Sequence, residues 1–142
     1  MSHQKKNSIS RKGLSEEFKK GEAQVSSLIL EGYLLKQQEC YEEAADKYAQ
    51  AATLEEKLCT ELSKKGLMDK YYSHFFSAAS CWAQAGNIHQ AIWMTNQLLR
   101  YPNIPERLRR QAEEYQQMLR ARRERWFAFL TQSLAPATAS ES

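Results

Sequence analysis

The chain has 142 residues, the length of one domain, and its 42% apolar and 26% charged residues are ordinary for a globular protein. No apolar run is long enough to cross a bilayer. Three cysteines without a close CxxC pair argue against a disulfide framework and against a structural zinc site. With few glycines and prolines and many good helix formers, the composition predicts an all-α, cytoplasmic protein with reduced thiols.

The net charge of +3 is distributed unevenly along the chain. Residues 1–21 hold six basic against two acidic side chains, whereas residues 22–65 hold five against nine. A basic chain end can bind a nucleic acid or an anionic membrane, although such an end is more commonly a solvated tail. Residues 1–13 are so polar that they predict a disordered basic arm.

The apolar positions that follow this arm predict two helices. From Leu14 they recur at spacings of three and four, which predicts a helix over 15–37 that begins at Ser15. After a turn at residues 38–39, a second stripe predicts a helix from Tyr41 that is closed by Gly66. Alanines allow close approach of helices, so the seam of this hairpin is expected at Ala44, Ala45, Ala51 and Ala52.

Three more helices are expected over about 68–85, 88–100 and 105–130, with residues 131–142 as a disordered tail. In the first of these, four rings occupy all sides of one turn, so one ring should be exposed as a binding anchor: Tyr71, Tyr72, Phe75 and Phe76. The last helix has an apolar side formed by Leu108, Ala112, Tyr115, Leu119, Trp126 and Leu130.

One pattern of small, large, turn and alanine positions occurs twice, offset by 47 residues. The first copy has Gly32, Leu35, Glu39 in the turn, Tyr41, Ala44, Tyr48 and Ala51, and the second has Ala79, Trp82, Gly86, Ile88, Ala91, Thr95 and Leu98. Over about residues 25–103 this pattern resembles the tetratricopeptide repeat (TPR), a helix-turn-helix unit of about 34 residues. The resemblance implies stacked antiparallel helical hairpins, a TPR-like α-solenoid fragment of about five helices with a C-terminal capping helix.

The resemblance also implies a function without catalysis, as an adaptor, scaffold or chaperone that binds a peptide or helix of another protein. The expected groove is lined by the first helices of the hairpins, at Ile29, Tyr33, Lys36, Gln37, Ser73, Phe76, Ser80 and Gln84. Because Tyr33 and Ser80 occupy the asparagine position of a carboxylate clamp, an apolar or aromatic segment is favoured. Two hairpins are fewer than such arrays need, so either the flanking helices complete the core or the chain forms a homodimer.

The basic last helix supports an alternative, association with nucleic acid. Its arginines lie close to Trp126 and include Arg109, Arg110, Arg120, Arg122 and Arg123. Interspersed glutamates make a solvated capping helix the favoured interpretation, ahead of an oligomer or partner interface, of nucleic acid and of an anionic membrane.

Chemistry-bearing residues are sparse. No histidine has the spacing of a metal ligand pair, and the glycines are too scattered for a phosphate loop. His74 and Cys81 could share a helix face, but a buried thiol beside an imidazole is the commoner arrangement. Neither a catalytic site, a metal nor a cofactor is therefore expected.

Overall fold

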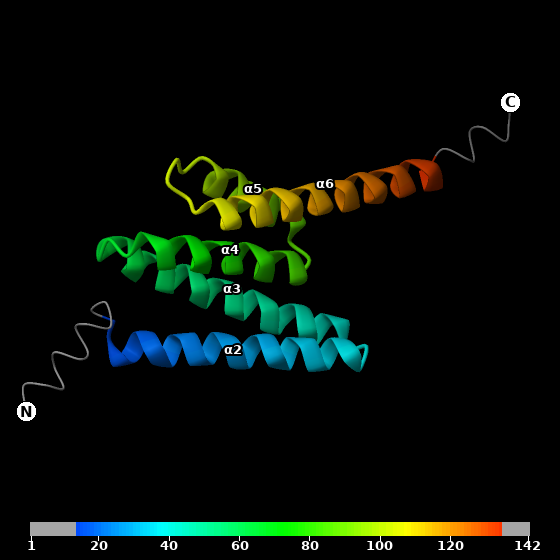
Figure 1. Cartoon of the computed structure of the whole chain (residues 1–142). Coiled ribbons are helices and arrows are strands. Elements are labelled where there is room, and N and C mark those ends of the chain that lie inside the picture. The colour runs from blue at the N-terminus through cyan, green and yellow to red at the C-terminus, as the bar shows by residue number, and fades with distance from the viewer. Residues whose placement is uncertain (1–13, 135–142) are drawn as a thin grey trace, which may run out of the picture.

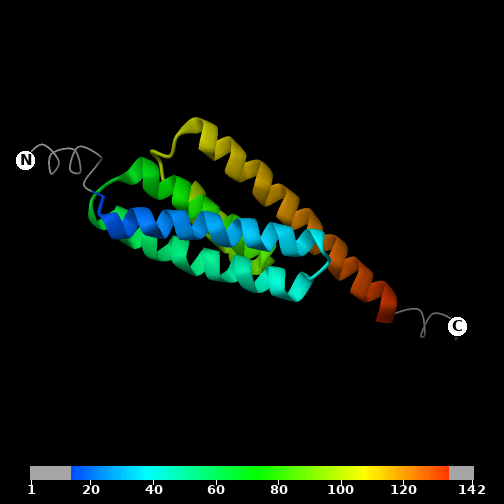
Figure 2. The same ribbon diagram turned by 90° about the horizontal axis from the view of Figure 1, so that it is seen from below.

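The computed structural model describes residues 14–134, which are all-helical as predicted. The helices are α2 (Glu16–Gln37), α3 (Tyr41–Lys64), α4 (Met68–Gln84), α5 (Ile88–Leu99) and α6 (Glu106–Leu134). They run antiparallel in succession, and each stacks on the one before it (Figures 1 and 2). The predicted arm and residues 135–142 of the predicted tail lie outside the described residues, whereas residues 131–134 belong to α6.

The first three interhelical turns share one hydrogen-bond geometry. In each, the residue that opens the next helix donates its backbone N–H to a carbonyl five residues earlier, at 2.8–3.0 Å: Cys40 to Leu35, Leu67 to Leu62, and Asn87 to Trp82. This is the Schellman arrangement, which requires a left-handed residue just before the donor. Gly66 and Gly86 meet that requirement without strain, while Glu39 adopts it at φ 63°.

Close approach between α2 and α3 depends on small residues, as the alanine pattern predicts. Ala44, Ala51 and Ala52 are buried, and Ala45 is half-buried. On α2, Gly32 lies so close to the ring of Tyr48 that a Cβ atom would be 2.8 Å from its Cε2. Gly32 therefore lets the Tyr48 ring pass beneath α2.

Helix α6 covers α5 and part of α4 with its first half only. Ala112 and Leu119 are fully buried there, and Arg109 donates hydrogen bonds to the carbonyls of Leu99 and Tyr101 at 3.2 and 2.9 Å. The second half of α6 extends beyond the other helices (Figures 1 and 2). Trp126, predicted to lie on the apolar side, is 56% exposed.

Candidate functional site

Half of the predicted groove residues lie together in a hollow of about 530 Å³ between α2, α3 and α4. The predicted residues in its lining are Tyr33, Lys36, Gln37 and Gln84. Glu39, Tyr41 and Tyr48 complete it. The repeat pattern singles out these three as repeat or turn positions, but only the fold shows that they share the hollow.

The hollow combines aromatic rings with one cation, Lys36, and one anion, Glu39. Tyr33 and Tyr41 are 52% and 61% exposed, and Tyr48 is buried beneath them. Lys36 Nζ donates a hydrogen bond of 2.7 Å to Gln84 Oε1 and thereby links α2 to α4. Burial, followed by the proximity of Cys81 and Tyr33, raises the pKa of the Tyr48 hydroxyl, so this ring stays neutral.

The other four predicted groove residues do not line this hollow. Phe76 is half-buried and meets the ring of Tyr115 on α6 edge-on, with centroids 5.6 Å apart. Ile29 packs against the core between α2 and α3. Ser73 is exposed and Ser80 is half-buried on α4. Because α6 packs against Phe76, the hollow is confined to the end of the first hairpin and Gln84.

The expectation of an exposed ring among the four aromatic residues at the start of α4 is wrong. Tyr72 is buried and the other three are half-buried. Tyr71 and Tyr101 share a hydrogen bond between their hydroxyls at 3.1 Å. Burial, reinforced by this bond, raises the pKa of Tyr71. The aromatic turn is thus part of the packing between α4, α5 and α6.

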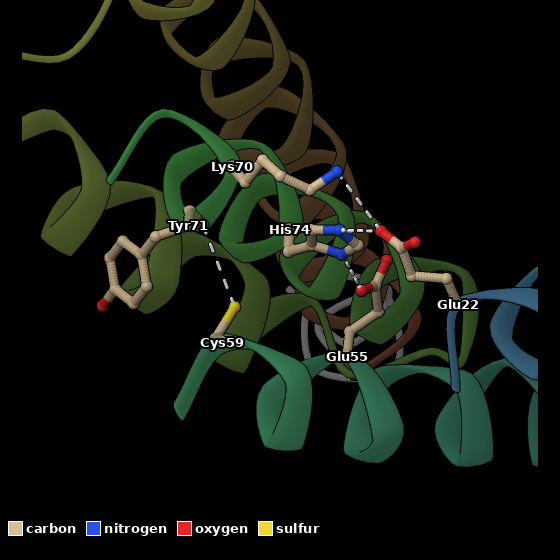
Figure 3. A network of polar contacts seen from close by, with 6 residues as sticks. All are labelled: Glu22, Glu55, Cys59, Lys70, Tyr71 and His74. Carbon is tan, nitrogen blue, oxygen red and sulfur yellow. Dashed lines mark hydrogen bonds and ion pairs between the residues drawn. The ribbon is translucent and has the colours of Figure 1, made fainter. Parts of the chain in front are cut away.

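His74 joins three helices through a polar network (Figure 3). Its Nδ1 donates to the Oε1 of Glu55 on α3 at 2.5 Å, and its Nε2 donates to the Oε2 of Glu22 on α2 at 2.9 Å. Lys70 lies 3.5 Å from the same Glu22 oxygen. Burial alone would lower the pKa of His74, but its hydrogen bonds and charge interactions with Glu55 and Glu22 outweigh that effect and raise it. The contacts with Glu55 and Glu22 therefore favour the protonated form of the imidazole.

The buried cysteines have no features of nucleophiles. Burial, with the charge of Glu55 adding to it, raises the pKa of both Cys59 and Cys81 to about 12. Both nitrogens of His74 bond to carboxylates and neither bonds to a thiol. Near neutral pH these two thiols remain protonated.

The five predicted basic-surface residues differ in their exposure and in whether other groups of the protein accept hydrogen bonds from them. Arg109 is engaged by two backbone carbonyls, and Arg120 donates to the side chain of Asn96 at 3.3 Å. Arg110 and Arg122 are exposed, and Arg123 is half-buried. At 3.6 residues per turn, these cations point to several sides of α6 instead of forming one face.

A second hollow, of about 420 Å³, lies between α3, α4 and α5, and no sequence pattern predicted it. Phe75, Met94 and the half-exposed Trp93 supply its apolar lining. Lys64 and Glu56 lie at the same hollow, and Glu56 accepts a hydrogen bond of 2.7 Å from the indole of Trp82.

Within residues 14–134, no three His, Cys, Asp or Glu side chains are placed to hold a metal ion. None of the helices in that region combines the length and the apolar character needed to span a membrane. No family model, curated protein or solved structure matches the chain.

Proposed function

We propose that this protein is an interaction module without catalytic activity, a small TPR-like adaptor or chaperone that binds a segment of another protein. The hollow at Tyr33, Lys36 and Gln84 carries the proposal. It lies on the first helices of both hairpins, the surface that the repeat resemblance assigns to partner binding. The free thiols of Cys59 and Cys81 suit the reducing cytoplasm, where we place the protein.

The lining of the hollow supports a particular chemistry for the segment. Two exposed tyrosine rings offer apolar surface at little cost in side-chain entropy. Lys36 presently donates to a neutral amide, and a carboxylate would be a stronger acceptor. The favoured ligand is a short segment with an acidic side chain next to an aromatic or apolar one.

A peptide-display selection on the full chain tests this proposal. Selected peptides should be enriched in acidic and aromatic residues. Their affinity, measured by titration calorimetry, should fall at least about tenfold for Tyr33→Ala and for Lys36→Glu. Lys20→Glu makes the same charge change on α2 outside the hollow, and Trp93→Ala removes an exposed ring from α5. Both controls should retain binding.

Binding that is lost in Trp93→Ala and kept in Tyr33→Ala would assign the peptides to the hollow between α3, α4 and α5, and the proposal would fail. The same would follow if the selection enriched no sequence.

Nucleic-acid association is the second candidate, supported by the exposure of Arg110 and Arg122. Phosphate contacts would make affinity fall steeply with salt, whereas binding in the hollow should depend on salt weakly. The dispersal of the arginines around α6 disfavours this candidate. Tight, salt-sensitive binding of an RNA or DNA oligonucleotide that is abolished by Arg110→Glu and Arg122→Glu would establish it.

A further inference from the structure

The second half of α6 has an apolar stripe without a neighbour among the described helices. Up to Leu119 the stripe faces the body of the protein, and Trp126 and Leu130 continue it at helical spacing. Trp126, Phe127 and Phe129 are between 56% and 59% exposed. Monomeric proteins normally expose large apolar side chains one at a time, whereas here three exposed rings lie within two helical turns. We call residues 120–133 the overhang.

The overhang is strongly basic. It holds four arginines against one glutamate. Arg122 and Arg123 precede Trp126 by four and three residues, so both lie on the same side of the helix, one turn away from the indole. A surface that covers these rings must therefore be apolar and acidic.

The first hairpin has a surface of this kind. On α2, Leu30 and Leu34 are 57% and 48% exposed, one turn apart. A hollow of about 350 Å³ beside Leu34 is lined by Glu31, Leu34, Leu35, Gln38 and Lys47. Residues 27–47 hold five acidic side chains against two lysines, and Lys47 lies 3.3 Å from Glu31. We call Leu30, Glu31, Leu34 and Leu35 the acceptor face.

The overhang and the turn that follows the acceptor face lie at the same end of the molecule (Figures 1 and 2). A two-fold axis at that end would bring each overhang to the acceptor face of the other copy, so that both contacts form together. We propose that the occupant of the overhang is the acceptor face of a second copy of this chain, in a closed dimer.

Charge and area favour this pairing over the alternatives. Two overhangs packed against each other would bring like charges together, which is destabilising. Exposed aromatic rings of this size contribute roughly 100 Å² each. Two overhangs, with the leucines that they cover, thus approach the area of about 1,000 Å² that a specific interface needs.

Sedimentation equilibrium of the full chain across micromolar concentrations tests the proposal. The mass should rise from the 16.5 kDa of one chain to twice that value. The double variant Trp126→Ala, Phe127→Ala should weaken the dimer at least about tenfold. Trp93→Ala, which removes an equally exposed indole from α5, should leave it unchanged. Circular dichroism and the thermal midpoint show that each variant folds.

Charge exchange between the two surfaces tests which surface pairs with the overhang. Arg122→Glu with Arg123→Glu changes the net charge of the overhang from +3 to −1, and Glu31→Lys with Glu43→Lys changes that of residues 27–47 from −3 to +1. Each double variant alone should dimerise more weakly. A mixture of the two should form heterodimers, because each overhang then faces an opposite charge.

A monomer at all concentrations would overturn the proposal, and so would a dimer that is indifferent to Trp126 and Phe127. Failure of the mixture to form heterodimers would exclude the acceptor face. A monomer that binds vesicles containing phosphatidylserine through Trp126 would assign the overhang to a lipid surface instead. None of these variants alters Tyr33, Lys36 or Gln84, so the proposed hollow succeeds or fails independently.

Discussion

The turns of the two hairpins share one hydrogen-bond geometry but differ in their residues. The turn between α2 and α3 has a left-handed glutamate, Glu39, where the turn between α4 and α5 has Gly86. At the close contact, Gly32 of the first hairpin lies against the ring of Tyr48, whereas Ala79 occupies the matching position in the second and is fully buried. The hydrogen bonds of the turn are therefore kept where the residue types differ.

The largest expected effect concerns the junction between the hairpins. Glu55→Ala removes a 3% exposed partner of His74 and leaves one nitrogen of a mostly buried imidazole without its hydrogen bond. We expect a loss of about 3 kcal/mol in the free energy of unfolding, measured by urea titration. Lys65→Ala, which disrupts only an exposed contact with Glu61 at 3.9 Å, should cost less than about 1 kcal/mol. Equal losses in the two variants would show that the network contributes no more to stability than an exposed contact does.

Gly32→Ala tests the close contact of the first hairpin. Helix propensity alone would stabilise the variant by about 1 kcal/mol. The new Cβ would lie 2.8 Å from the Tyr48 ring, and overpacking of this kind costs about 1–3 kcal/mol. We expect a net loss of about 1 kcal/mol, because the ring is buried and has little room to move. A more stable variant would mean that Tyr48 shifts freely.

The turns predict opposite outcomes for matched substitutions. Glu39→Gly should stabilise the protein by up to about 1 kcal/mol, because glycine adopts a positive φ without strain. Gly86→Ala should destabilise it by about 1 kcal/mol, and here strain is the sole cause, since a Cβ would meet no atom within 4 Å. Thermal unfolding of both variants checks the pair. Changes of the same sign would contradict the structural equivalence of the two turns.

The smallest expected effect is a dependence of stability on pH. Because the folded-state pKa of His74 is raised above its usual 6.5, its stabilisation is complete below that value and is lost as pH rises through the folded-state pKa. The difference in stability between the protein and His74→Gln should therefore be larger at about pH 6 than at about pH 9. Glu22, Glu55 and Lys70 face the imidazole in both measurements. A constant difference would show that protonation of His74 contributes nothing.

The positions of the helices could largely be predicted from the sequence, because residues close to each helix end determine where it begins and ends. Gly66 and Gly86 end helices, and the alanine stripe of α3 marks its seam. Glu39 lacks the usual glycine signal, yet its turn forms because the same hydrogen bonds are available to its backbone.

The candidate site could be predicted only in part, because periodicity identifies the buried face of a helix but not the helix that packs against it. The hollow unites Tyr33 and Gln84 as the repeat pattern predicts, while Phe76 lies against Tyr115, a pairing that depends on how α6 crosses α4. The bonds of His74 span 19 and 52 residues of sequence. Only the packing of three helices brings these groups together.

The succession of short turns has a consequence for folding kinetics. Each helix packs mainly on the helices before and after it in the chain, so the native contacts close only short loops. Helical proteins with such low contact order fold in microseconds to milliseconds. In an array coupled through nearest neighbours, opening begins at the ends. Amide exchange in the monomer should therefore be slowest in α3 and α4, and fastest in the overhang of α6.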